Sequence, residues 1–366
     1  MKLSEDIAGW LDTHAEALDR GTHASGDRNA SDAPAELLST LARAGLFRIG
    51  VPAARGGTGG TTTDAVLAIA ATAAHSQAAG FVFWAQRVFI EYLLQSPNDV
   101  LAARWLPPLL DGTFAGATGL SNAMKYLGGI ESLQTQLEPT PEGWIANGQV
   151  PWATNLVKNN FAVAVAADDN GSGRPGVYAI PHDAPGVTRS PDLDLVGLRG
   201  SSTASLRFTD ARLAREYLLH DDAHDYLPRV RPAFLGMQCG LSIGLAQRSI
   251  AGARERGEAG RSILSDELDA LAITLDEQTR LLSEGIESRV FETAPRGLFE
   301  LRIGLVDTAI AATQLEVQAR GGAGYMVGRD GGLARRWREA SFLPIVTPSL
   351  VQLRTALAEA RQRKVA

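Results

Sequence analysis

The periodicity of the sequence changes twice, and this order restricts the folds that the chain can adopt. In roughly the first third, apolar residues recur every three or four positions, as at Ile7, Leu11 and Leu18, which predicts helices. From Thr113 to about Leu219 the pattern alternates, with turns and β-branched residues, which predicts strands. Beyond this region the helical period returns, so we expect a mainly α protein with a central β domain.

Length and composition fit two or three packed units. The chain has 366 residues, of which 45% are hydrophobic and 21% are charged, so it can bury a sizeable core and is not expected to be disordered. We expect an N-terminal helical domain in residues 1–112, a middle β domain in residues 113–222 and a C-terminal helical bundle in residues 223–366.

Several elements can be placed individually. One long Ala-rich helix is expected from about Thr63 to Gln95. The segment from Arg335 to Arg361 is expected to be a loop that contains Pro344 and Pro348, followed by a terminal helix. Glycines that recur every four residues predict close packing of two helices; they are Gly236, Gly240 and Gly244. Two further long helices are expected from about Ser265 to Ser288 and from about Pro295 to Arg320, the second ending at Gly321-Gly322.

Charge, cysteine content and hydropathy exclude several classes of protein. The net charge of -6 gives no basic footprint for nucleic acid. The single cysteine, Cys239, excludes an intrachain disulfide and a Cys-rich metal site. The N-terminus lacks a signal-peptide pattern, and the chain lacks an apolar run of about 18 residues that would span a membrane. We therefore expect a cytoplasmic protein whose partners are small molecules or other subunits.

Two segments have a functional and a structural interpretation. The glycine-rich segment 55–60 could bind phosphate, but no strand, Lys-Ser/Thr pair or GxGxxG spacing accompanies it, so we interpret it as a turn. His220 and His224 have the i, i+4 spacing of a helix within an Asp-rich segment, which could bind a divalent cation. A solvated linker at the β-to-helix junction explains the same residues, and we expect no metal site.

The stretch 143–155 carries the most informative pattern. Two alternating runs meet at Asn147-Gly148, a dipeptide typical of a two-residue type I′ turn, which predicts a hairpin. In the second strand, Trp152 and Thr154 are two residues apart, so their side chains point to the same side of the sheet. An indole face and a hydroxyl on one side can bind the face and edge of a flat ring. A half-buried strand with a core tryptophan has the same pattern.

This stretch resembles the G-Y-x-L-N-G-x-K-x-W-I-T-N hairpin of the acyl-CoA dehydrogenase family, whose Trp and Thr lie against the isoalloxazine of FAD. Other segments are similar to family motifs in the same order along the chain: 45–60, 116–119, 197–208, 318–325 and 338–340. The resemblance implies an acyl-CoA dehydrogenase-like fold with an N-terminal helical domain, a middle β-barrel domain and a C-terminal four-helix bundle.

The resemblance also implies a cofactor site for FAD, with reduced FMN as the alternative. The family's Gln-x-x-Gly-Gly motif touches FAD bound mainly by a neighbouring subunit, which implies a homodimer or homotetramer formed through the C-terminal helices. The residues implied for the cofactor are Ala117, Thr118, Trp152, Thr154, Arg256, Gln318, Gly321 and Gly322. Those implied for the substrate side are Arg199, Ser201 and Arg231.

The chain departs from the family pattern where the chemistry resides. Aligned from Arg338, the family's I-Y-E-G-T segment falls on residues 345–349, so Thr347 stands in the position of the catalytic glutamate. The alternative position of this base, on the helix before Arg-Pro, is Val230. Neither side chain can remove the α-proton of a thioester. In the first flavin motif, Gly119 replaces the usual glutamate.

Three functions remain open from the sequence. The first is a flavin-dependent oxidoreductase of the acyl-CoA dehydrogenase type, whose family activity is the oxidation of a CH–CH bond in an acyl thioester with an electron-transfer partner. The second is a two-component monooxygenase, in which a flavin reductase supplies reduced flavin and no glutamate base is required. Such relatives use a His or Ser near the flavin, and His75 is the candidate. The third is a non-catalytic paralogue that binds flavin or a partner.

Overall fold

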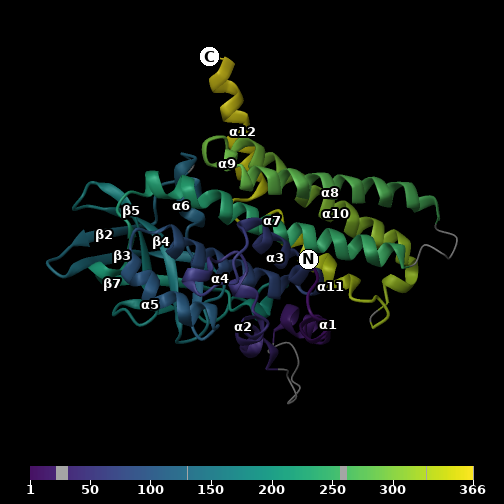
Figure 1. Ribbon diagram of the computed structural model, residues 1–366, viewed down its shortest axis with the longest axis horizontal. Coiled ribbons are helices and arrows are strands. Elements are labelled where there is room, and N and C mark those ends of the chain that lie inside the picture. The colour runs from purple at the N-terminus through teal and green to yellow at the C-terminus, as the bar shows by residue number, and fades with distance from the viewer. Residues whose placement is uncertain (22–31, 130, 256–261, 327, 366) are drawn as a thin grey trace.

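The computed structural model describes residues that fall into a helical part, a sheet and a second helical part. In Figure 1 the sheet lies at one end of the molecule, and the long helices α7 (Ala223–Arg254), α8 (Ser265–Glu287) and α10 (Arg296–Gly324) extend toward the other. The expected mainly α fold with a central β region is thus confirmed. The described residues are 1–21, 32–129, 131–255, 262–326 and 328–365.

The N-terminal part is helical, as predicted, but its longest expected helix is wrong. The chain breaks at Ser76, where the backbone is extended (φ -152°). The Ser76 hydroxyl accepts a hydrogen bond from the Ala79 amide at 3.3 Å and caps the second of the two helices. The helices of this part are α1 (Glu5–Arg20), α2 (Ala33–Arg43), α3 (Thr62–His75), α4 (Gln77–Gln95) and α5 (Asp99–Leu110).

The middle part is one mixed eight-stranded sheet with the order β6-β7-β3-β2-β4-β5-β8, to which β1 adds by pairing with β4. In place of the expected barrel, the structure has a sheet whose order begins with β6 and ends with β8, so these two are its edge strands. A short helix, α6 (Ser121–Leu127), follows β1. The strands are β1 (Ala115–Thr118), β2 (Thr135–Pro139), β3 (Gly143–Ala153), β4 (Phe161–Asp169), β5 (Arg174–Pro181), β6 (Val187–Arg189), β7 (Ala204–Ala214) and β8 (Leu218–His220).

The hairpin predicted at Asn147-Gly148 is wrong. These residues lie inside the continuous strand β3, where its register with β7 shifts at a β-bulge. Gly148 has φ +146°, and a Cβ there would lie 2.2 Å from the carbonyl oxygen of Gln134. Asn147 exchanges two hydrogen bonds with Asp210 across the bulge, at 3.1 and 2.9 Å. The dipeptide thus supplies the positive φ that a bulge also requires.

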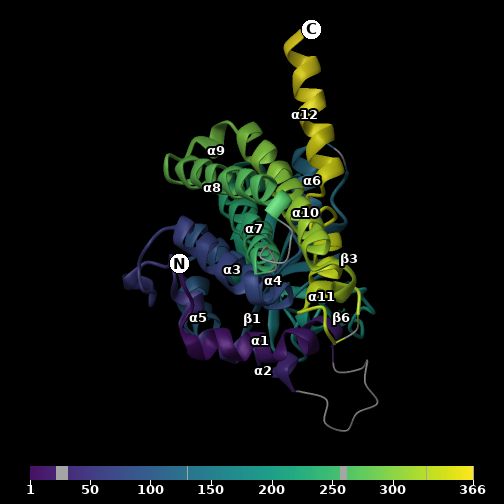
Figure 2. The same ribbon diagram turned by 90° about the vertical axis from the view of Figure 1, so that its right-hand side faces the viewer.

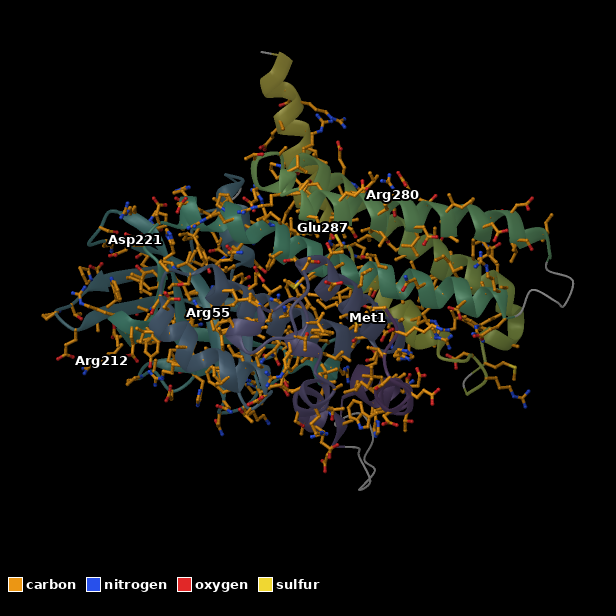
Figure 3. The ribbon with its side chains drawn as sticks, in the orientation of Figure 1. Met1, Arg55, Arg212, Asp221, Arg280 and Glu287 are labelled. Atoms are coloured by element: carbon orange, nitrogen blue, oxygen red, sulfur yellow. The ribbon has the colours of Figure 1, made fainter. Side chains whose placement is uncertain are left out.

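The C-terminal part is organised around α7. Figures 1 and 2 show this helix between the N-terminal helices and the outer helices α8 and α10. The predicted close packing is confirmed, because a Cβ on Gly240 would lie 2.7 Å from the carbonyl oxygen of Val66 and one on Gly244 would lie 2.2 Å from that of Ala70. On the outer face of α8, Arg280 pairs with acidic residues of the same helix (Figure 3).

The loop predicted at residues 335–340 is wrong, because these residues belong to helix α11 (Leu333–Phe342). Gly321 has non-helical backbone angles inside α10 (φ 54°, ψ -149°), close to the predicted helix end. Helix α9 spans Val290–Thr293, and α12 (Leu350–Val365) contacts α10 and then projects from the body in both ribbon views. Within the described residues, no helix has the length and apolar character needed to cross a bilayer.

Candidate functional site

A cavity of about 200 Å³ lies between the sheet and the helical parts. On one side it is lined by residues at the end of β1, along β3 and on β4. On the other side it is lined by α4, by the end of α11 and by residues 345–347 of the loop that follows. We refer to these two sides as the sheet wall and the helical wall. They differ in chemical character.

The sheet wall brings together three of the predicted cofactor residues. Trp152, Thr154 and Thr118 all line the cavity. The predicted strand spacing does not explain this, because Thr154 follows the end of β3 and all residues from Gln149 to Thr154 line the cavity. The indole of Trp152 is 43% exposed, whereas Thr154 and Thr118 are buried. Gly119 also lines the cavity, and a Cβ at that position would lie 2.9 Å from the carbonyl oxygen of Ala164. An exposed aromatic face next to two hydroxyls suits a planar ring with polar edges.

The hydroxyl of Thr154 belongs to a buried group of three. Its Oγ1 lies 2.7 Å from Oγ1 of Thr203, which lies 2.7 Å from Oγ of Ser201. Thr154 Oγ1 also lies 3.2 Å from the carbonyl oxygen of Ser201. All three residues are at most 2% exposed. The predicted substrate residue Ser201 therefore stands behind the sheet wall and does not line the cavity.

The hydroxyl of Thr118 is hydrogen-bonded to a residue of helix α4. Tyr92 lies with its hydroxyl 2.8 Å from Thr118 Oγ1, and the Leu120 amide donates to the same oxygen at 3.3 Å. Burial raises the pKa of Tyr92 far above its usual value, and the hydrogen bond with Thr118 offsets only part of this rise. Burial thus favours the neutral phenol.

Two predicted cofactor residues, Ala117 and Thr118, are neighbours on β1, and their backbone amides point to opposite edges of this strand. The amides of Ala115 and Gly119 donate to β4-side carbonyls at 3.0 and 2.7 Å, whereas the Gly116 amide donates to Gln86 on the other edge. Amide directions alternate along a strand. The amide of Thr118 therefore points to the same edge as that of Gly116, and the amide of Ala117 points toward β4. Ala117 is fully buried and does not line the cavity.

The helical wall is aromatic. Phe81 and Trp84 of α4 stack with ring centroids 5.4 Å apart and an interplanar angle of 4°. Phe342 meets Phe81 edge-on at 4.8 Å, and Trp84 meets Phe234 edge-on at 5.2 Å while its indole N–H donates to the Phe234 carbonyl at 3.1 Å. Of these rings, Phe81, Trp84 and Phe342 line the cavity.

The predicted base position, Thr347, lines the cavity from the loop after α11. Two buried side chains donate hydrogen bonds to the backbone of this loop. Gln238 donates to the Thr347 carbonyl at 3.1 Å, and Arg302 donates to the Leu343 carbonyl at 3.0 Å and to Gln238 at 2.9 Å. Burial lowers the pKa of Arg302. The position of Thr347 is therefore well determined by the fold.

Among the described residues that line the cavity, Lys125 is the only ionisable one. Lys125 pairs with Glu131, which also accepts a hydrogen bond from Asn122 at 3.1 Å. Burial raises the pKa of Glu131, but the hydrogen bonds from Lys125 and Asn122 and the charge of Lys125 outweigh it and leave the pKa lowered. The described lining offers no carboxylate and no imidazole as a base.

Other predicted site residues lie away from the cavity lining. Val230 is fully buried in α7, so a carboxylate there would be desolvated. Arg231 is largely buried and stacks on Phe299 at 5.9 Å. Arg199 pairs with Asp194 at 2.7 Å. A direct substrate contact by these arginines stays a prediction that the cavity lining does not support.

The histidine candidates also lie elsewhere. His75 ends α3 and bonds to Asp12 at 2.8 Å, outside the cavity lining. His220 and His224 do not share a helix, because the first lies in β8 and the second in the first turn of α7. Asp222 caps α7 between them. The part of the chain that the structure describes contains no cluster of His, Cys, Asp and Glu that could hold a metal ion.

The predicted dinucleotide-tail residues lie on the outside of the bundle. Gln318 and Gly322 are exposed and Gly321 is half-buried near the end of α10, and Tyr325 beyond them is 95% exposed. Arg256 lies outside the described residues. These positions do not contribute to the lining of the cavity.

Sequence reasoning missed several residues that shape the site. Tyr92 and Thr203 polarise the two threonines, and Lys125 supplies the only charge in the described lining. Phe81 and Trp84 have the i, i+3 spacing of one helix face, which indicates a shared surface but not a cavity. No local signal pairs Tyr92 with Thr118 or Thr203 with Thr154, because each pair is formed by tertiary structure.

Comparison with known proteins agrees with this architecture. Residues 11–113 match the model of the acyl-CoA dehydrogenase N-terminal domain. The chain is 26% identical over 346 residues to the probable acyl-CoA dehydrogenase YngJ of Bacillus subtilis, with 88% of each chain covered. The N-terminal part of the chain thus matches an acyl-CoA dehydrogenase domain, and most of the chain is similar in sequence to a probable acyl-CoA dehydrogenase.

Two solved structures show the range of similar folds. A glutaryl-CoA dehydrogenase from Mycobacterium smegmatis in complex with FADH2 superposes with a TM-score of 0.79 at 16% identity, covering 99% of this chain and 95% of that one. KijD3 in complex with FMN and a dTDP-linked amino-keto sugar superposes with a TM-score of 0.78 at 19% identity, covering 98% and 91%. The fold is therefore shared by proteins with different ligands.

Proposed function

We propose that this protein is a flavin-dependent oxidoreductase that binds the isoalloxazine of FAD in the cavity between the two walls. The observation that carries this proposal is the sheet wall, where an exposed indole, Trp152, stands beside the hydroxyls of Thr118 and Thr154. The superfamily relationship and the FADH2 complex of one structural neighbour support it. Bound flavin would supply the two-electron chemistry.

The residues of this chain would bind and orient that group. Trp152 offers a face for stacking, Thr118 and Thr154 offer hydrogen bonds at the ring edge, and the aromatic rings of the helical wall exclude water. Thr347 faces the same space but cannot act as a base without an activating partner. Within the described lining, we find no other group suited to remove the α-proton of a thioester.

We therefore propose that efficient desaturation of acyl thioesters is not the activity. A second candidate, a two-component monooxygenase, is favoured by the carboxylate-free lining. In that reaction one oxygen atom of O2 enters a substrate bond to hydrogen and the other leaves as water. Two electrons and two protons come from reduced flavin, which a reductase partner supplies. The nucleotide-sugar complex of KijD3 supports substrates other than acyl-CoA on this fold.

A direct experiment separates these functions. The purified protein is reconstituted with FAD and titrated with acyl-CoAs of several lengths under anaerobic conditions, with flavin absorbance as the readout. The expected result is stable flavin binding without bleaching. Failure to bind flavin in either redox state contradicts the proposal and favours a non-catalytic role. Rapid bleaching by an acyl-CoA keeps the flavin site but contradicts the proposed loss of desaturation.

We also propose a symmetric homodimer or homotetramer formed through the C-terminal helices. The exposed positions Gln318, Gly322 and Tyr325 support this proposal, because a motif for the dinucleotide tail serves a purpose only if a second copy presents that tail. Light scattering at micromolar concentration with FAD present tests it. A monomer under these conditions contradicts it.

A further inference from the structure

The cavity is bounded by helix α4 on the side where α7 lies. None of the described residues of α7 lines the cavity, whereas Phe81 and Trp84 of α4 do. Trp84 is almost completely buried, and its ring meets that of Phe234 on α7 edge-on with centroids 5.2 Å apart. Phe234 itself is fully buried. The indole of Trp84 therefore fills the space between the cavity and α7.

Two hydrogen bonds join α4 to α7 beside the cavity. The indole N–H of Trp84 donates to the carbonyl of Phe234 at 3.1 Å, and the side-chain amide of Gln77 donates to the carbonyl of Leu241 at 2.8 Å. The two bonds lie two helical turns apart and run between antiparallel helices. Between them, a Cβ on Gly80 would lie 3.1 Å from the side chain of Leu241. The helices are thus in close contact there, and an alkyl chain cannot pass between them.

The lining near α6 and the start of β2 is polar. An apolar chain placed against it would remove water from polar groups without replacing their hydrogen bonds, which is unfavourable. This part of the lining is therefore suited to a ligand with polar groups and not to an alkyl chain. The polar lining residues are Ser121, Asn122, Lys125, Gln134, Thr135 and, on β3, Gln149.

We propose that Trp84 is a specificity-determining residue, which limits the depth of the cavity and restricts the substrate to compact molecules without an extended apolar chain. This inference rests on the proposed function and deepens it, because it names the class of substrate. A long chain would have to displace a buried indole that is held by a hydrogen bond and by the rings of Phe81 and Phe234. A compact molecule with polar groups needs no such displacement.

The test is the affinity for straight-chain primary alcohols from ethanol to decanol, measured by isothermal titration calorimetry with and without saturating FAD. Each CH2 group that enters an apolar space should raise the affinity about fourfold. In the wild type this rise should stop at or before about six carbons, since a cavity of about 150 Å³ holds one molecule of the size of benzene.

Trp84→Ala is expected to extend the rise by about three carbons or more, because it opens a space that is continuous with the cavity. Decanol should then bind at least about 30-fold more tightly than it binds to the wild type. The matched control is Trp105→Ala, because Trp105 of α5 is also buried but does not line the cavity. In this control the rise should stop at the same chain length as in the wild type.

Trp84→Leu provides a second, milder variant. It removes the indole N–H and part of the ring volume but keeps an apolar side chain in the core, so it should destabilise the fold less than Trp84→Ala does. The rise in affinity is expected to extend by about one or two carbons, that is about fourfold for each CH2 group. If Trp84→Ala unfolds below the assay temperature, Trp84→Leu decides the matter alone.

The outcomes separate this inference from the proposed function. A wild-type affinity that keeps rising through decanol overturns the restriction to compact molecules, while the flavin site stands if FAD binds. An unchanged chain-length limit in the folded Trp84 variants overturns the role of Trp84. Failure to bind FAD in either redox state overturns the proposed function, whereas the chain-length limits measured without FAD still report whether Trp84 closes the cavity.

Discussion

The two walls of the cavity differ in how they are built. On the sheet wall, Thr118 and Thr154 are held by hydrogen bonds from fully or nearly fully buried neighbours. On the helical wall, Phe81 and Trp84 present packed rings, and Thr347 stands on a loop. The sheet wall thus provides hydroxyl groups that can bond to the polar edge of a ring. The helical wall provides apolar packing surface, and none of its described lining residues can act as a base.

This difference separates binding from chemistry. The polar contacts of the sheet wall depend on β1, β3 and the segment before β7, which are also required for the sheet. The reactive position depends on one side chain of the loop at Thr347, whose backbone is fixed by Gln238. A substitution at Thr347 can therefore change the chemistry while the flavin site and the fold persist.

The largest expected effect comes from restoring a carboxylate to the helical wall. Thr347→Glu should accelerate reduction of bound flavin by acyl-CoA about 10²–10⁴-fold, the range typical of a general base. Anaerobic stopped-flow absorbance measures the rate. Thr347→Gln has the same size without a base and should behave as the wild type.

Two results would break the comparison between the walls. Wild-type bleaching at about 1 s⁻¹ or faster, the range of ordinary turnover, shows that a base lies within reach. Equal acceleration by Thr347→Gln shows that side-chain size, and not proton transfer, limits the rate.

The two tryptophans, one on each wall, give the next largest contrast. Trp84 is 3% exposed and Trp152 is 43% exposed. Trp84→Ala should lower the free energy of unfolding by about 3–5 kcal/mol because it leaves a cavity in the core. Trp152→Ala should change it by less than about 1 kcal/mol and should instead weaken flavin binding. Urea unfolding and flavin titration on both variants measure these effects. Similar unfolding free energies for the two variants would contradict the distinction.

The sequence predicts the helices and the strands well where the hydrophobic periodicity is sustained. The prediction fails where the same residues are compatible with two local structures. Asn147-Gly148 allows positive φ in a turn and in a bulge alike, and only the pairing with Asp210 distinguishes them. Ser76 breaks a helix whose apolar pattern continues on both sides. Neither outcome is encoded in the neighbouring residues.

The candidate site is predictable to the same degree. The i, i+2 spacing of Trp152 and Thr154 is not sufficient to place them, because β3 ends at Ala153 and its register with β7 shifts between Val150 and Ala153. The hydrogen-bond partners of the two threonines are not predictable, since Thr203 and Tyr92 reach them from segments 49 and 26 residues away. Only the family resemblance indicates that a carboxylate is missing at Thr347.

A smaller effect tests whether the sheet wall contacts the ligand edge. Thr154→Val removes the hydroxyl and keeps the shape, so flavin affinity should fall by about 3–10-fold. Thr313→Val, which removes an equally buried hydroxyl from α10, should leave the affinity unchanged. An unchanged affinity and flavin spectrum for Thr154→Val would remove this residue from the site.

The smallest expected effect concerns the one ion pair at the cavity. The pKa of Glu131 is lowered in the folded protein by Lys125 and Asn122, so the pair stabilises the fold above the unfolded pKa of about 4.3. This stabilisation is lost as the pH falls through the lowered pKa and Glu131 becomes protonated. Because the pair is partly exposed, Glu131→Gln should cost less than about 1 kcal/mol at pH ~7 and nothing measurable at pH ~3. Urea midpoints at both pH values provide the comparison, with exposed Glu142→Gln as the control. A deficit that grows as the pH falls would show that Glu131 is not stabilised by Lys125, and the charge of Lys125 would then be free to meet a ligand.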